Sequence, residues 1–218
     1  MCYILNIETS TKNCSVSLAK NGLAISSREI ADTGYSHAEK LHVFIEEVIN
    51  ECDIKISDLG AVAISMGPGS YTGLRIGVAA AKGICYASEL PLIAVDTMEV
   101  LARQIKVSEG LIMPMIDARR MEVYTATFDK AYNKITPTQA VIVTEELGNG
   151  ITEKITLLGD GAFKCKDILD ESKFEIRINA NYPSALQMGN LSYDKFLKKD
   201  FEDLAYFEPF YLKEFFST

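Results

Sequence analysis

The chain has 218 residues, of which 48% are hydrophobic and 24% charged, a composition typical of a folded domain with a buried core. Its 22 basic and 30 acidic residues give a net charge of −8, and such a surface repels the phosphate backbone of nucleic acids. Free-standing nucleic-acid binding is therefore disfavoured, and we expect a partner to make most contacts with any nucleic acid.

The cysteines and the first residues indicate the compartment. Five cysteines, an odd number without a C-x-x-C pair, predict reduced thiols of a cytoplasmic protein. The opening residues, MCYILNIETS, lack a basic segment and become polar after seven residues, so we expect neither a signal peptide nor a membrane span.

Three strands are predicted at the start of the chain. Residues 3–7 form an apolar run that ends at Glu8, and residues 14–19 alternate between apolar and polar. Asn21-Gly22 separates this segment from a further run through Ile25. Asn-Gly between two such runs favours a type I′ turn, so we expect an antiparallel hairpin and three antiparallel strands in all.

Helices and buried strands follow. Ser36-His37-Ala38-Glu39 has the pattern of a capping box, and the helix after it carries an apolar stripe at three-and-four spacing. A buried strand is predicted at 61–66, a helix from about 72 to 88 and a short strand at 90–95. Asp96 or Thr97 is expected to cap a further helix.

The second half is predicted to repeat this order of strands and helices. We expect strands at 111–117 and 121–129 around a tight turn at 118–120, a strand at 139–143 with helical residues after Thr144, and a strand at 155–159 that enters a helix. A last helix is expected from Ser184 to about Lys199. The order strand, strand, strand, helix, strand, helix thus occurs twice, which predicts lobes at 1–105 and 106–218. Residues 201–218 hold seven aromatics, and we expect them to pack back on the first lobe.

The segment ISMGPGSYTGLRIGVAAAKG, residues 64–83, is rich in glycine between a strand and a helix. It matches neither the phosphate-binding P-loop, nor the dinucleotide fingerprint, nor the nucleophile elbow of hydrolases. Two interpretations stay open. The helix N-terminus can bind an anion, or the glycines only allow a tight crossover and close packing. The candidate phosphate- or nucleotide-binding residues are Glu8, Thr9, Ser10, Gly67, Gly69, Ser70, Thr72, Gly73 and Arg75.

Metal binding is poorly supported. His37 and His42 lie five residues apart, which places them about 140° apart around a helix, so we interpret them as surface histidines. Glu8 and Asp117 each end the first strand of a half, where a carboxylate can hold Mg²⁺ or cap a turn. We favour the turn cap for Asp117 and leave Glu8 open.

Several stretches together resemble the TsaB family, also called YeaZ. They are ILNIETSTKNCSVSLAKNG, SHAEKL, ISMGPGSYTGLRIGVAAAKGICYA, PLIAVDTMEVLA, MPMIDARRMEVYTA and EPFYLK, in order along the chain. The resemblance implies an α/β actin-like ATPase fold with two ribonuclease-H-like lobes. It also implies a role in bacterial synthesis of threonylcarbamoyladenosine, the modified base beside the anticodon of tRNAs that read codons beginning with A.

The resemblance further implies partners. Members of this family pair through the first lobe with TsaD, the transferase subunit, and the ATPase TsaE joins them. The chain is then expected to be a non-catalytic scaffold that reaches tRNA only through the complex. It would require no cofactor of its own, although ATP or ADP with Mg²⁺ can occupy the complex. The alternative is an independent kinase or a metalloprotease-like enzyme of the same fold.

The expected partner surface lies on helices 36–50 and 72–88, which we expect to form a bundle with the matching helices of TsaD. Alone, the same face is expected to pair with a second copy as a homodimer. The predicted interface residues are Leu41, Phe44, Ile45, Val48, Ile76, Ala79, Ala80 and Gly83.

Overall fold

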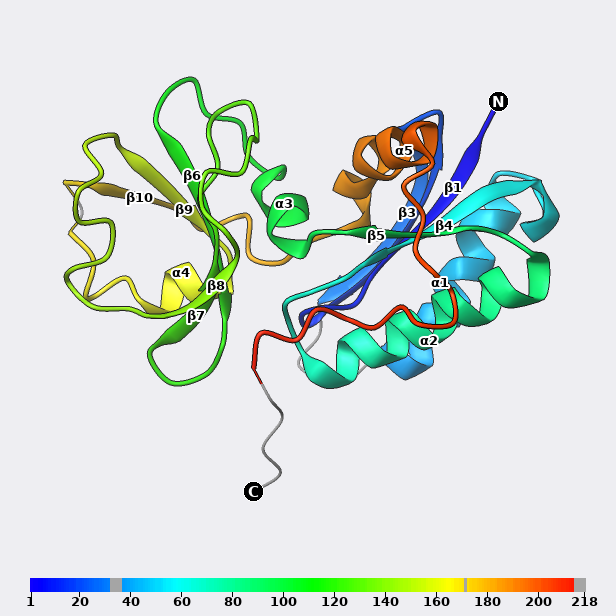
Figure 1. Ribbon diagram of the computed structural model, residues 1–218, viewed down its shortest axis with the longest axis horizontal. Coiled ribbons are helices and arrows are strands. Elements are labelled where there is room, and N and C mark those ends of the chain that lie inside the picture. Colours follow the sequence, from blue (N-terminus) through cyan, green and yellow to red (C-terminus); the bar gives the residue numbers. More distant parts are fainter. Residues whose placement is uncertain (32–36, 171, 214–218) are drawn as a thin grey trace. The chain divides into compact units, whose positions relative to one another are not determined.

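The computed structural model describes residues 1–31, 37–170 and 172–213, which divide into two compact units. The first unit comprises residues 1–100 together with the segment from Ser184 on, and the second comprises residues 101–183. Each unit is built on a five-stranded mixed sheet (Figure 1). The predicted capping serine, Ser36, lies outside the described residues.

The first sheet has the strand order β3-β2-β1-β4-β5. Its first three strands are antiparallel neighbours, as predicted, and β4 and β5 add in parallel beside β1. Asn21 and Gly22 form the predicted hairpin turn, with φ of 49° and 89°. The strands are β1 Tyr3–Glu8, β2 Asn13–Lys20, β3 Leu23–Ala31, β4 Leu59–Ser65 and β5 Leu92–Val95.

Helices cover both faces of the first sheet. The long helices α1 (His37–Glu51) and α2 (Tyr71–Ser88) pack on one face and run beside each other (Figure 1). Alternate residues of β1 and β4 face the other side, where they pack against α5 (Met188–Lys198). Three further helices are short. They are η1 Ile56–Asp58, α3 Thr97–Ala102, which crosses the boundary between the two units, and η2 Ala185–Gln187.

The position of α5 corrects the expected lobe boundary. The sequence places this helix in the second lobe, at 106–218, but Met188 and Leu191 share a buried cluster with Ile4 and Ala63 of the first sheet. Ser192 also donates a hydrogen bond to the buried Asn6 side chain at 2.7 Å. Chain order alone could not reveal these contacts, because they join residues far apart in the sequence.

The second sheet has the order β10-β9-β6-β7-β8, which is the strand order of the first sheet repeated. The prediction of helical residues after Thr144 is wrong. Residues 145–150 form turns, and Gly148 and Gly150 have φ of 71° and 83°. The last strand was not expected. The elements are β6 Leu111–Asp117, β7 Glu122–Thr125, β8 Gln139–Ile142, β9 Ile155–Leu158, α4 Asp160–Lys164 and β10 Phe174–Arg177.

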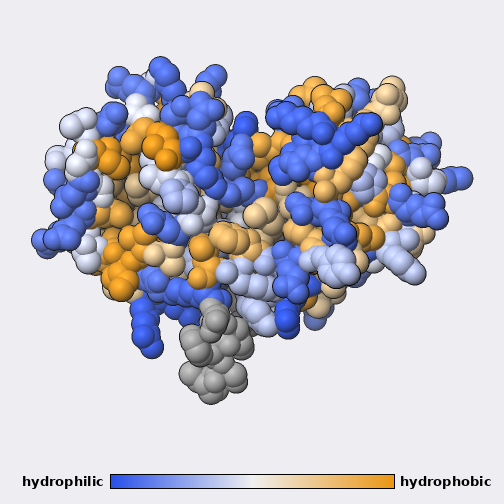
Figure 2. Space-filling view, viewed as in Figure 1, coloured by the Kyte–Doolittle hydropathy of each residue, from blue (hydrophilic) through white to orange (hydrophobic). Residues whose placement is uncertain are grey.

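The described part of the terminal segment packs on the first unit, as predicted. Glu202 donates its N–H to the carbonyl of Leu92, and Phe210 donates to that of Met66. Phe207 packs against the core, whereas Tyr206 is 84% exposed. On the face drawn in Figure 2, hydrophobic and hydrophilic residues are interspersed over the first unit. Among the described residues, no helix is long and apolar enough to cross a membrane.

Candidate functional site

The glycine loop joins β4 to α2 and lies against the chain that follows β1. Ser70 caps α2, because its side chain accepts from the N–H of Gly73 at 3.3 Å. The N–H of Ser70 is itself used, since it donates to the carbonyl of Ser10 at 2.6 Å. Gly67 donates its N–H to the Thr97 hydroxyl at 2.9 Å. The loop amides at Gly67, Ser70 and Gly73 are therefore paired within the protein.

The glycines of this loop are needed for close approach. A Cβ on Gly69 would lie 2.1 Å from the carbonyl oxygen of Ser10, and one on Gly73 would lie 2.1 Å from that of Thr9. No side chain fits at such a distance from backbone. These contacts favour the packing interpretation of the loop over anion binding, and anion binding stays a prediction.

Glu8 is fully buried where β1 ends. Its Oε1 accepts from the N–H of Ser10 at 2.6 Å, so it caps the turn that follows the strand. Burial raises the pKa of the Glu8 carboxyl, which the hydrogen bond from Ser10 only partly offsets. Binding of Mg²⁺ or a nucleotide by Glu8 stays a prediction.

The other predicted anion-binding residues differ in exposure. Thr9 is buried and donates its hydroxyl to the carbonyl of Gly73 at 2.8 Å. Thr72 and Arg75 are exposed on α2, and the Arg75 guanidinium lies over the Tyr71 ring at 4.4 Å from its centroid. Arg75 is thus held at the start of α2 by an aromatic contact.

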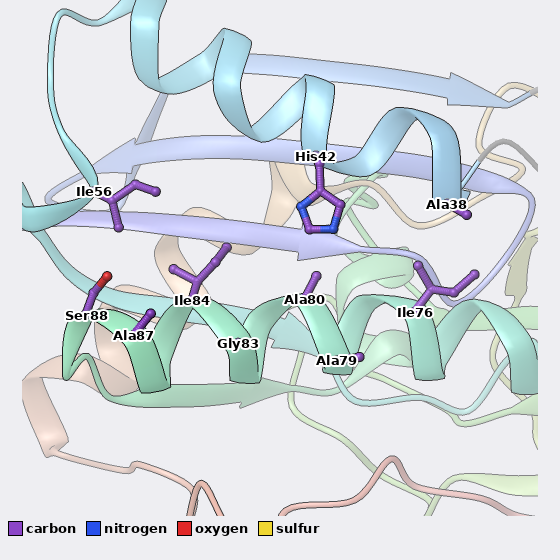
Figure 3. A pocket seen from close by; sticks show the side chains of 10 residues that line it. All are labelled: Ala38, His42, Ile56, Ile76, Ala79, Ala80, Gly83, Ile84, Ala87 and Ser88. Atoms are coloured by element: carbon purple, nitrogen blue, oxygen red, sulfur yellow. The ribbon is translucent and has the colours of Figure 1, made fainter.

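A second feature, the α1–α2 groove, is an apolar hollow between the two long helices, with a volume of about 590 Å³. In Figure 3 the side chain of His42 points from α1 towards Ala80 of α2, and Ile76 and Ile84 point back towards α1. Gly83 lies between them without a side chain, and a Cβ there would meet no atom within 4 Å. The lining residues are Ala38, His42, Ile56, Ile76, Ala79, Ala80, Gly83, Ile84, Ala87 and Ser88.

The groove corrects half of the predicted interface. Leu41, Ile45 and Val48 are at most 5% exposed, because the apolar stripe of α1 faces its own sheet. Phe44 is partly buried and packs against the same core. The apolar spacing shows that α1 has a buried side but not what covers it.

The α2 half of the prediction falls in the groove. Ile76, Ala79, Ala80 and Gly83 all line it. Sequence reasoning missed Ala38, His42 and Ile56, which line it from the other side. Ala38 and His42 lie four residues apart beside the buried stripe of α1, and this spacing was the available signal.

The two histidines have different environments. The prediction that His37 is a surface histidine is wrong. Its side chain is buried, with 5% exposed, and its Nε2 lies 2.8 Å from the carbonyl oxygen of Thr11. Burial lowers the pKa of His37 despite this hydrogen bond. His42 is exposed, as predicted. Within the described ranges, no three His, Cys, Asp or Glu residues are grouped to hold a metal ion.

Asp117 caps the hairpin after β6, as predicted. Its Oδ1 accepts from the N–H of Arg119 at 2.8 Å, and the same oxygen pairs with Lys164. The five cysteines are free thiols, and Cys14, Cys85 and Cys165 are buried. Burial raises the pKa of Cys14 and of Cys85 to about 11, which makes both poor nucleophiles.

Comparison with known proteins identifies relatives over most of the chain. The model of the family "TsaD: tRNA N6-adenosine threonylcarbamoyltransferase" matches residues 31–212. The tRNA threonylcarbamoyladenosine biosynthesis protein TsaB of Escherichia coli is 28% identical over 219 residues, covering 96% of this chain and 94% of that protein. TsaB of Bacillus subtilis is 33% identical over 147 residues, covering 66% of this chain and 64% of the relative, just under two thirds of its length.

A solved structure has the same fold. YeaZ from Pseudomonas aeruginosa superimposes with a TM-score of 0.86 at 22% identity, covering 97% of this chain and 100% of that one. The predicted α/β actin-like fold is confirmed.

Proposed function

The chain belongs to the TsaB (YeaZ) family, and from this premise we propose that it is a non-catalytic subunit in the synthesis of threonylcarbamoyladenosine in tRNA. It pairs with the transferase TsaD, and TsaE joins them in a cytoplasmic complex. The chain requires no cofactor of its own, and ATP or ADP with Mg²⁺ belongs to the complex. Without TsaD, the chain pairs with a second copy.

The α1–α2 groove is the observation that carries this proposal. It is lined almost entirely by apolar side chains, and its α2 side presents the small residues Ala79, Gly83 and Ala87 to solvent. Small residues let the backbone of a second helix approach closely, and an exposed apolar hollow marks a protein-binding surface. A helix pair from TsaD would bury this hollow.

The residues that could supply chemistry have structural roles instead. Glu8 is buried and caps a turn, and His37 contacts the main chain of Thr11. The glycine loop is closed over Thr9 and Ser10. These contacts support a subunit that acts through its surface rather than through a reaction of its own.

The acidic surface supports an indirect role towards tRNA. A net charge of −8 disfavours contact with a phosphate backbone, so TsaD or TsaE supplies most of that contact. The chain activates TsaD by binding its active conformation in preference to others, which shifts the equilibrium towards that conformation.

Reconstitution tests the proposal. TsaD, TsaE, ATP, Mg²⁺, the threonylcarbamoyl donor and unmodified tRNA are combined with and without this chain, and modified adenosine is measured. We expect formation of the modified base to depend on the chain. Equal rates without it would contradict the scaffold role.

Calorimetry of the isolated chain with ATP and Mg²⁺ tests the alternative, an independent kinase or metalloprotease-like enzyme of the same fold. Tight nucleotide binding with turnover would instead identify an enzyme in its own right.

A further inference from the structure

The α1–α2 groove is apolar inside and acidic at its rim. His42 lines the groove, and Glu39 and Glu46 lie three residues before it and four after it on α1. This spacing places both carboxylates on the same side of the helix as His42, and both residues are exposed. Glu89 is exposed next to Ser88, where the α2 side of the groove ends.

The positive charges near the groove are placed differently: Lys40 is exposed on α1, but two residues from His42 correspond to about 200° around the helix, which puts it on the other side of α1. Lys55 precedes the lining residue Ile56, and its backbone N–H donates to the carboxylate of Asp58 at 2.8 Å, so an acid accompanies this lysine. Arg75 lies over the ring of Tyr71 at the start of α2. The rim is therefore negative along its α1 side and at the end of α2.

The small residues of the groove also restrict the shape of a partner. Gly83 has no neighbouring atom within 4 Å of a Cβ position, and Ala79 and Ala87 on the same helix are exposed. Large side chains from outside are needed to fill such a hollow to the density of a protein interior.

We propose that the groove selects a partner helix that carries large apolar side chains flanked by Lys or Arg. This inference rests on the proposed function, because it specifies the chemistry of the TsaD helix that docks there. A second copy of this chain is the poorer occupant. It brings a net charge of −8 and its own exposed Glu39 and Glu46 to the rim, so like charges would face each other across the contact.

The rim charges act on selectivity more than on the strength of apolar contact. Exposed opposite charges across an interface raise the association rate and reject like-charged partners. They are screened by salt, with a Debye length of about 10 Å at 0.1 M. Affinity for TsaD should therefore fall as salt rises, whereas pairing with a second copy should not weaken in the same way.

Charge reversal at the rim tests this. The double variant Glu39→Lys/Glu46→Lys is compared with Glu145→Lys/Glu146→Lys, which makes the same change in net charge at exposed residues of the second unit. The full chain is titrated with TsaD by calorimetry between about 0.05 M and about 0.5 M salt. Self-association of each variant is measured by analytical ultracentrifugation.

We expect the rim variant to bind TsaD about tenfold more weakly than wild type at the lowest salt, with the difference disappearing at the highest salt. The matched variant should bind as wild type does. Equal weakening of both variants would overturn the proposal in favour of net charge alone. Unchanged TsaD affinity with altered self-association would overturn it in favour of a second copy as the occupant.

Failure of this inference can be told apart from failure of the proposed function. If Gly83→Arg abolishes the complex but the rim variant binds TsaD normally at every salt concentration, the docking site stands and only the basic partner helix is wrong. If Gly83→Arg leaves the complex intact, the docking site itself is wrong.

Discussion

The two units share one strand order but differ in the helices that cover it. In the first unit, α1 and α2 span 15 and 18 residues, whereas in the second α4 has five residues and turns replace the counterpart of α1 (Figure 1). The short cover still completes a core in the second unit, around residues such as Val123 and Leu157. Long helices are therefore not needed to bury this kind of sheet, and in the first unit they add an outward-facing groove.

The two units use glycine alike where the fourth strand enters its helix. In the first unit, Gly73 packs against the carbonyl of Thr9, just after β1. In the second, Gly159 packs against the carbonyl of Met115, near the end of β6, and a Cβ on either glycine would lie 2.1 Å from the carbonyl oxygen. The glycine-rich junction is thus a requirement of the fold in both units, which weakens its value as a sign of phosphate binding.

The largest expected effect tests this shared junction. Gly73→Ala and Gly159→Ala each force a methyl group into backbone, and Gly159 also has φ of 100°. We expect each to destabilise the protein by about 3 kcal/mol or more. Thermal unfolding followed by circular dichroism measures this.

The matched control is Gly83→Ala on the open face of α2. Glycine disfavours a helix and the new methyl group meets no neighbour, so this substitution should stabilise the protein by about 0.5–1 kcal/mol. Comparable losses at Gly83 and at Gly73 would show that crowding does not explain the junction.

The carboxylates at the ends of β1 and β6 sharpen the comparison. Glu8 and Asp117 each accept from the N–H two residues on, but only Glu8 is fully buried. Burial raises the pKa of Glu8 above its ordinary value of 4.5, so the folded state holds a proton that the unfolded chain releases. This contribution to stability is present below about pH 4.5 and is lost as the pH rises through the folded-state pKa.

The substitution Glu8→Gln keeps an acceptor for Ser10 and cannot ionise. We therefore expect it to be more stable than wild type at neutral pH and equal to it at low pH. The free energy of unfolding of both proteins, measured across this range, decides the sign. A wild type that gains stability over the variant as pH rises would contradict a buried, neutral Glu8.

A smaller effect is expected at Lys82, whose side chain ties α2 to the backbone of the terminal segment. Lys82 of α2 donates to the carbonyls of Ala205 and Phe207, each at 3.2 Å, and so holds the terminal segment. Lys82→Met should cost about 1 kcal/mol and speed hydrogen exchange around Phe207. Unchanged exchange there would mean that the aromatic contacts alone hold the segment.

The smallest effect is expected at Asp117→Asn. Its pair with Lys164 is partly exposed, with side chains 41% and 23% accessible, and asparagine keeps an oxygen for the Arg119 N–H. We expect a loss below about 1 kcal/mol in the free energy of unfolding. A larger loss would mean that this turn is more than a solvated cap.

Much of the fold could be predicted from the sequence, because local patterns specify it. The Asn21-Gly22 turn, the buried strand β4 and the cap at Asp96, which accepts from the N–H of Met98, all follow from neighbouring residues. The expected helix after Thr144 failed because Gly148 and Gly150 take positive φ there, and apolar spacing does not reveal this.

The site was less predictable for a physical reason. An amphipathic stripe reveals that a helix buries one side, yet Leu41 and Val48 bury theirs in the chain's own core. Whether an apolar residue faces the core or a groove depends on how α1 and α2 pack together, and these helices are distant in sequence. Small residues such as Gly83 were better indicators, because they add little to the core.

The affinity of TsaD for the Gly83→Arg variant tests the central claim most directly, namely that the α1–α2 groove is the partner surface. Gly83 has open space around it, so arginine should fold normally while blocking helix approach. Leu197→Arg on α5, which is 62% exposed on the opposite face of the first sheet, is the matched control. We predict that Gly83→Arg loses TsaD binding while Leu197→Arg retains it. Equal, wild-type affinity for both variants would contradict the account.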